Sequence, residues 1–138
     1  MRVRSTHVLL AAIHIALVTA FAGCSSGPLE FDNDTLSDAL SVTDVQKTPI
    51  PDPAAPGRVV GLRVAATVIN SGFFTIDVPF LMRWSLLRGG SVFASETLNM
   101  PAGLSPGDSR RATLTIRFES IESLAGLQDA VTFDVLQP

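Results

Sequence analysis

The chain has 138 residues, with ten Lys or Arg against thirteen Asp or Glu and a formal net charge of −3. This length suits one domain with an ordinary hydrophobic core. The acidic balance argues against nucleic acid as a partner, because the phosphate backbone attracts Lys and Arg. A single cysteine excludes an internal disulfide, so stability must come from the core.

The first 23 residues have the composition of a secretory signal peptide. Residues 1–7 contain Arg2 and Arg4 and no acid, and an almost unbroken apolar run covers residues 8–23. A basic segment followed by an apolar one is typical of such a signal. A retained transmembrane helix is the weaker interpretation, because a span takes about 20 apolar residues and no basic stop-transfer cluster follows.

Two cleavage sites overlap at the end of the apolar run. An ordinary signal peptidase would cut after Ala22, at a small-x-small site, and release a soluble chain. The residues Ala22-Gly23-Cys24 resemble the lipobox of bacterial lipoproteins, in which small residues precede an obligatory cysteine. We therefore favour a lipoprotein signal peptide over plain secretion and over a structural thiol at Cys24.

The lipobox resemblance implies cleavage between Gly23 and Cys24 and attachment of diacylglycerol and a further acyl chain, such as palmitate, to Cys24. Two or more acyl chains hold a protein firmly on a bilayer. The expected location is the cell envelope, outside the cytoplasm. Ser25, rather than aspartate, follows the cysteine, which in a cell with two membranes is similar to lipoproteins sent to the outer membrane.

An acidic segment follows the cysteine. Residues 25–57 hold six acids and one lysine, a net charge of −5, whereas seven arginines balance seven acids from Arg58 onward. We expect residues 24–40 to form a flexible, lipidated tether and residues 41–138 to form the folded domain. Asp32-Asn33-Asp34 is similar to the start of a calcium loop, but Leu36 stands where the loop needs an acid or amide and Ser37 where it needs a glycine, so no metal is predicted.

Alternating apolar and polar residues predict half-buried antiparallel strands through most of the remaining chain. A first strand is expected near residues 41–47, followed by a stiff loop at 48–57 that contains four prolines. The inward rows expected in the later strands are Val60, Leu62, Val64, Ala66 and Val68; Ile76, Val78, Phe80, Met82, Trp84 and Leu86; Ala112, Leu114, Ile116 and Phe118; and Val131, Phe133 and Val135.

Turn residues separate these strands. Asn70-Ser71-Gly72 ends one strand, Gly89-Gly90 predicts a two-residue hairpin, and Pro106-Gly107 predicts a type II turn. Pro79 lacks an N–H donor, so its strand should begin there or lie at a sheet edge. Residues 120–127 interrupt the alternation and predict a short helix or helical turn that covers one end of the core.

These elements predict an all-β fold: one immunoglobulin-like antiparallel β-sandwich of about six to seven strands with one short helix. Trp84 is either the tryptophan that such domains carry on their third strand or an ordinary core residue. Asn70-Ser71-Gly72 and Leu104-Ser105-Pro106-Gly107 resemble turns of bacterial adhesion-related modules. The order of elements is also similar to the late-embryogenesis-abundant type 2, water-stress domain. Both resemblances imply a sandwich without catalytic activity.

Residue types argue against an enzyme. Both histidines lie in the predicted signal peptide, and the chain has no tyrosine. Nucleophilic catalysis with a histidine base and ordinary zinc sites therefore lack their residues, and no cofactor is expected. Within the predicted domain, Glu119 and Glu122 are the only near pair of carboxylates, and we expect them to favour the start of the short helix.

Binding is the remaining function, and two residue groups are candidates. Phe73 and Phe74 follow a turn, where one could be exposed as an apolar anchor, although we favour both being partly buried. Arg63, Arg83, Arg111 and Arg117 occupy outward positions and could form a basic face for an acidic glycan, a lipid headgroup or an envelope protein. Solvated charges paired with Asp77 and its neighbours explain the arginines equally well.

The sequence predicts a membrane-anchored envelope or surface lipoprotein that displays a non-catalytic binding or structural module. The alternative is a lipoprotein that protects against desiccation, like the water-stress domains.

Overall fold

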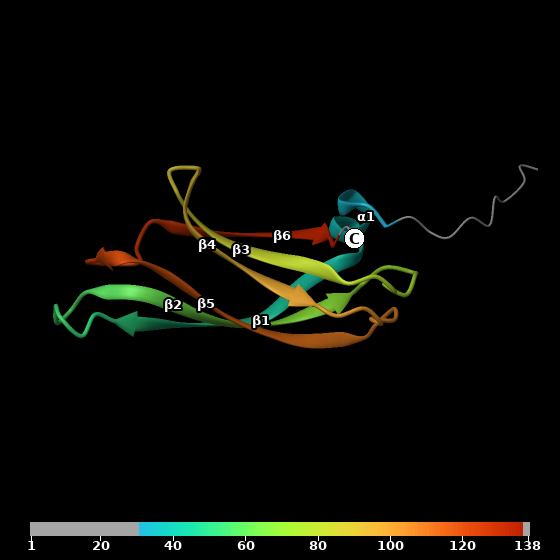
Figure 1. Cartoon of the computed structure of the whole chain (residues 1–138), viewed down its shortest axis with the longest axis horizontal. Coiled ribbons are helices and arrows are strands. Elements are labelled where there is room, and N and C mark those ends of the chain that lie inside the picture. Colours follow the sequence, from blue (N-terminus) through green and yellow to red (C-terminus); the bar gives the residue numbers. More distant parts are fainter. Residues whose placement is uncertain (1–30, 137–138) are drawn as a thin grey trace, which may run out of the picture.

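The computed structural model describes residues 31–136, which form two antiparallel sheets packed face to face, with one helix at one end (Figure 1). The elements are α1 (Asn33–Ala39), β1 (Leu40–Pro51), β2 (Val59–Asn70), β3 (Phe80–Arg88), β4 (Ser91–Met100), β5 (Ser109–Ile121) and β6 (Leu127–Val135). One sheet has the order β1-β2-β5 and the other β4-β3-β6. This connectivity corresponds to strands A, B and E of an immunoglobulin-like sandwich facing strands C, C′ and F. The all-β sandwich is confirmed.

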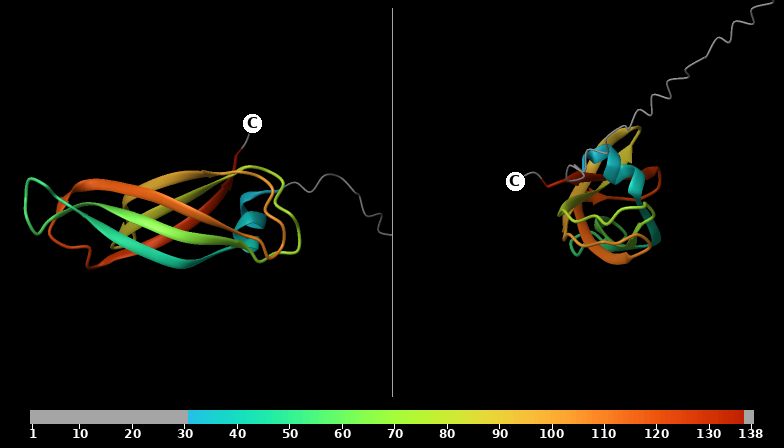
Figure 2. Two further views of the ribbon diagram at one scale, coloured as in Figure 1. Left: turned by 90° about the horizontal axis from the view of Figure 1, so that it is seen from below. Right: turned by 90° about the vertical axis from the view of Figure 1, so that its right-hand side faces the viewer.

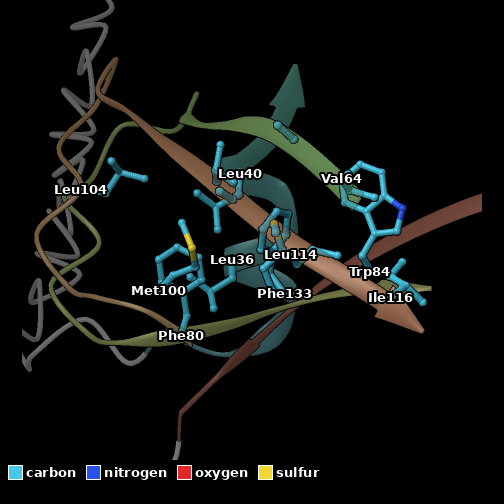
Figure 3. Close-up of a cluster of buried hydrophobic side chains, with 14 of the residues drawn as sticks. Leu36, Leu40, Val64, Phe80, Trp84, Met100, Leu104, Leu114, Ile116 and Phe133 are labelled. Atoms are coloured by element: carbon cyan, nitrogen blue, oxygen red, sulfur yellow. The ribbon is translucent and has the colours of Figure 1, made fainter. Parts of the chain in front are cut away.

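Side-chain alternation explains why these strands pair as two sheets. In β2, Leu62, Val64, Ala66 and Val68 are buried, whereas Arg63 between them is exposed. β3 and β5 repeat the arrangement, so the apolar faces of the two sheets pack on each other and exclude water. Figure 3 shows this core, with Trp84 from one sheet and Leu114 and Ile116 from the other.

The predicted turns between the strands are confirmed. Gly89 and Gly90 join β3 to β4 with φ of 58° and 82°, the left-handed conformation that a tight hairpin of this type needs. The turn before β5 closes with a 2.9 Å hydrogen bond from the N–H of Asp108 to the carbonyl of Ser105. β3 begins immediately after Pro79, where a missing N–H removes no hydrogen bond from the ladder.

The predicted loop at residues 48–57 is only half correct. β1 continues through Pro49, which pairs with Leu62, and ends at Pro51, which pairs with Val59. β1 is one of the two edge strands of its sheet, and an edge strand tolerates proline because one side of it faces no partner. The connection to β2 is therefore confined to residues 52–58.

The predicted helix at residues 120–127 is wrong. β5 continues to Ile121, a bend and a turn follow, and β6 begins at Leu127. The turn closes with a 3.2 Å hydrogen bond from the N–H of Leu127 to the carbonyl of Leu124, and Gly126 has a φ of 80°. The three-residue spacing of Ile121, Leu124 and Leu127 comes from this turn between strands rather than from a helical face.

The helix that the structure does contain, α1, lies within the residues expected to form a flexible tether. Its N-cap is Asp32, whose carboxylate accepts hydrogen bonds from the Thr35 N–H at 2.7 Å and the Thr35 hydroxyl at 2.6 Å. These two bonds hold the pKa of Asp32 below its ordinary value of 3.8, and the bond from the Thr35 hydroxyl has the larger effect. Leu36 is fully buried in the core (Figure 3). The folded unit therefore starts before residue 41.

α1 also joins the two ends of the described chain. It packs against β6, and the Asn33 side-chain oxygen accepts a 2.8 Å hydrogen bond from the N–H of Val135. Asp32, Asp34 and Asp38 thus belong to or cap a packed helix. The predicted signal peptide, its cleavage site and Cys24 lie outside the described residues.

Candidate functional site

The end of the sandwich that carries α1 also carries the two longest loops between its strands. Residues 71–79 connect β2 to β3, and residues 101–108 connect β4 to β5. Both loops lie beside α1 at the same end of the molecule (Figure 2, left). The β3–β4 hairpin and the connection from β1 to β2 lie toward the opposite end (Figure 1).

Asn70 holds the first of these loops in shape. Its side chain is fully buried and makes three hydrogen bonds. The amide donates to the carbonyls of Phe74 at 2.7 Å and Leu104 at 2.9 Å, and the side-chain oxygen accepts from the N–H of Gly72 at 2.9 Å. The last contact is an Asx-turn, which explains why asparagine stands two residues before this glycine.

Backbone hydrogen bonds fasten the same loop on both sides. The N–H of Ser71 donates to the carbonyl of Ala39 at the end of α1, at 2.7 Å. Ile76 and Leu104 form an isolated antiparallel bridge, with N–H to carbonyl distances of 2.9 and 3.1 Å. Gly72 leaves little space, because a Cβ there would lie 2.9 Å from the Ala39 Cβ. The loop is therefore fixed between α1 and the neighbouring loop.

Phe73 and Phe74 project from this fixed loop into solvent. Phe73 is 91% exposed and Phe74 53% exposed, so the expectation that both are partly buried is wrong for Phe73. Together with the half-buried Phe31 they line an open pocket of about 210 Å³, completed by Thr35, Asp38, Ala39 and Gly72. An exposed apolar side chain on a fixed loop is a candidate anchor for an apolar partner.

The four arginines proposed as one basic face do not share a face. Arg63 on β2 and Arg111 and Arg117 on β5 are exposed in the β1-β2-β5 sheet, whereas Arg83 is exposed on β3 in the other sheet. Because the two outer faces point in opposite directions, Arg83 cannot act with the other three. Alternation along a strand predicts whether a side chain points inward or outward, but it does not predict to which sheet the strand belongs.

The three remaining arginines are Arg63, Arg111 and Arg117, and we call the surface that they form the arginine face. Arg63 pairs with Thr115 and Arg117 pairs with Gly61, so the two arginines are diagonal neighbours, about 7–8 Å apart at Cα. Arg111 pairs with Thr67 further along the sheet. Within residues 31–136, these arginines and Arg83 make no ion pair, so pairing with Asp77 is not observed.

A second pocket, of about 170 Å³, lies at the edge of the sandwich where β1 meets β6. Asp129 on β6 forms an ion pair with Lys47 on β1 and accepts a 3.0 Å hydrogen bond from the Trp84 indole. Trp84 is 2% exposed and lies on the third strand, in the place that immunoglobulin-like domains give to a tryptophan. These contacts explain Asp129 as a structural partner of both residues.

The carboxylates considered for catalysis line neither of the two pockets described above. Glu119 lies near the end of β5, and Glu122 lies in the bend that follows, 3.6 Å from the Arg58 guanidinium. Among residues 31–136, no cluster of His, Cys, Asp or Glu has the composition and spacing to hold a metal ion. In the same range, no helix has the length and apolar character needed to cross a bilayer.

Comparison with protein-family models, with curated proteins and with solved structures finds no significant match to this chain.

Proposed function

We propose that the protein is a lipoprotein, anchored through acyl chains on Cys24, that holds a non-catalytic binding domain at a membrane surface of the cell envelope. The observation that carries the proposal is the position of the sole cysteine. It directly follows a signal-like apolar run and precedes the first described residue, Phe31, by seven positions. A lipidated cysteine so close to a folded unit keeps that unit beside the bilayer.

The arginine face supports a binding role for the domain. It presents three cations on the outer surface of a sheet, among the exposed or half-exposed threonines Thr67, Thr113 and Thr115. A guanidinium group binds carboxylate or sulfate through two parallel hydrogen bonds, and threonine hydroxyls add donors and acceptors. An acidic glycan or an acidic patch on an envelope protein fits this chemistry.

The anchor is tested by the intact mass of the protein isolated from its native host. The proposal expects a chain that begins at Cys24 and carries acyl chains, and it expects Cys24→Ser to move the protein from the membrane to the soluble fraction. An unmodified chain that begins at Gly23, or a Cys24→Ser protein that stays in the membrane, would refute the anchor.

The binding role is tested by exchanging Arg63, Arg111 and Arg117 together for glutamine and measuring retention on immobilised polygalacturonate. Arg83→Gln is the matched control, because it removes an exposed arginine from the opposite sheet. We expect the triple variant to lose retention and the control to keep it. Equal retention of both would reject the arginine face. If the triple variant kept its partners but its host survived drying poorly, the result would instead favour the desiccation-protective alternative.

A further inference from the structure

From the geometry of the α1 end, we infer that the Phe73–Phe74 loop inserts into the interface of the bilayer that holds Cys24. This loop, residues 71–74, would be a second membrane contact, made by protein side chains, and would orient the sandwich with its α1 end toward the lipid. The inference rests on the proposed lipid anchor. It adds a ligand for the loop, namely the acyl chains and headgroups at the membrane surface.

The first argument is the combination of exposure and fixed geometry. Phe73 is 91% exposed although the loop that carries it is held by the buried Asn70 and by one hydrogen bond from Ser71 to Ala39. A loop fixed in this way cannot fold back to bury the ring. The phenyl group therefore presents its apolar surface to whatever lies beyond the α1 end of the molecule. Phenylalanine is among the apolar residues that amphipathic segments bury in a membrane interface.

The second argument is the reach of the chain. Seven residue steps separate Cys24 from Phe31, which corresponds to at most about 25 Å of fully extended backbone. Strands of 12 residues such as β2 are about 40 Å long. An anchored sandwich therefore keeps its α1 end within reach of the bilayer. Phe31 lines the same pocket as Phe73 and Phe74, so the chain leads to the anchor from beside these rings.

The third argument concerns the charges around the rings and the kind of lipid surface. Asp38 lines the pocket, and the exposed Asp32 and Asp34 lie nearby at the start of α1. This acidic surround is repelled by anionic headgroups, so attraction between unlike charges cannot hold the loop on the membrane. Insertion must rely on the phenyl groups, and zwitterionic lipid is the surface that suits it best.

The experiment uses the full chain, processed in its native host and reconstituted in phosphatidylcholine vesicles whose acyl chains are brominated near the headgroup. Bromine quenches indole fluorescence on contact. Phe73→Trp places an indole on the loop, and the native Trp84, which is 2% exposed, supplies a buried background. The matched control is Val92→Trp, at a residue 62% exposed beside the hairpin at the opposite end.

We expect brominated lipid to cause a several-fold loss of the emission contributed by position 73 and no loss at position 92. Quenching at neither position, with acyl chains still present on Cys24, overturns the inference and leaves the anchor intact. Equal quenching at both positions shows that the sandwich lies along the bilayer and also overturns it. The inference is also overturned if a photo-crosslinker at position 73 joins the protein to one envelope protein in native membranes and brominated lipid does not quench position 73. A Cys24 without acyl chains overturns the anchor, and the inference with it.

Discussion

The role of Asn70 leads to the most direct test of the structure. Asn70→Ala removes all three hydrogen bonds of a fully buried side chain. The carbonyl of Leu104 keeps a partner, because it also accepts from the N–H of Ile76 at 2.9 Å. The other two groups, the Phe74 carbonyl and the Gly72 N–H, are only partly buried and can reach water. The cost is therefore the net value of the bonds rather than the full penalty of stranded polar groups.

At about 1 kcal/mol for each bond, Asn70→Ala should lower the free energy of unfolding by about 3 kcal/mol. For a domain of this size, such a loss lowers Tm by about 12 °C or more. Urea unfolding followed by the fluorescence of Trp84, the sole tryptophan, measures the change. Asn99→Ala is the matched control, because Asn99 is exposed on β4, and it should change stability by less than about 0.5 kcal/mol.

Asn70→Asp separates the hydrogen bonds from the shape of the side chain. Aspartate keeps the oxygen that accepts from Gly72, but it places a second oxygen against the carbonyls of Phe74 and Leu104 and buries a charge. It should therefore destabilise the protein more than alanine does, despite its nearly identical volume. If the aspartate variant matched the wild type, or if alanine cost no more than the Asn99 control, the reasoning about this network would be refuted.

Three further predictions concern the rest of the sandwich. Asp129→Ala removes the acceptor of the Trp84 indole and should lower the free energy of unfolding by about 1–2 kcal/mol and shift the tryptophan emission; an unchanged spectrum and Tm would contradict the bond. Gly61→Ala places a Cβ 2.9 Å from the backbone oxygen of Ile116, so it should cost about 1–3 kcal/mol in thermal unfolding, and a neutral effect would show that the sheet yields there. The pKa of Asp32 in the folded protein is lower than its ordinary value of 3.8, so the ionised carboxylate stabilises the folded state at pH values above 3.8. This stabilisation is lost as the pH falls through the pKa of Asp32 in the folded protein. The Tm difference between wild type and Asp32→Asn should therefore be constant near neutral pH and vanish in strong acid, and a difference independent of pH would exclude this linkage.

The sequence predicts the central strands well, because their alternation has one physical cause. β2 and β5 bury one face only, so their apolar residues recur at every second position. β1 was harder to predict, because its prolines forbid a central strand and only the sheet order shows that it lies at an edge. Our prediction misses α1, because a run of acidic residues is typical of a solvated tether. Asp32 as an N-cap and the four-residue spacing of Leu36 and Leu40 were the available signals.

The candidate binding residues show where local patterns stop being informative. Outward positions for the arginines follow from alternation, but the separation of Arg83 from Arg63 depends on which strands pair across the whole chain. The exposure of Phe73 depends on contacts that Asn70 makes with Leu104, 34 residues away. A dipeptide of phenylalanines does not encode such a contact, so the sequence could not decide between burial and exposure.

The hydrogen bond between Asn33 and Val135 has a consequence for the order of assembly. It joins residues 102 positions apart, so this contact of α1 forms only when the last strand is in place. Closing so large a loop is a late and entropically expensive step, and proteins dominated by such distant pairings fold slowly. On the export route that we propose, α1 would therefore complete its packing against β6 only after nearly all of the chain had left the translocation channel.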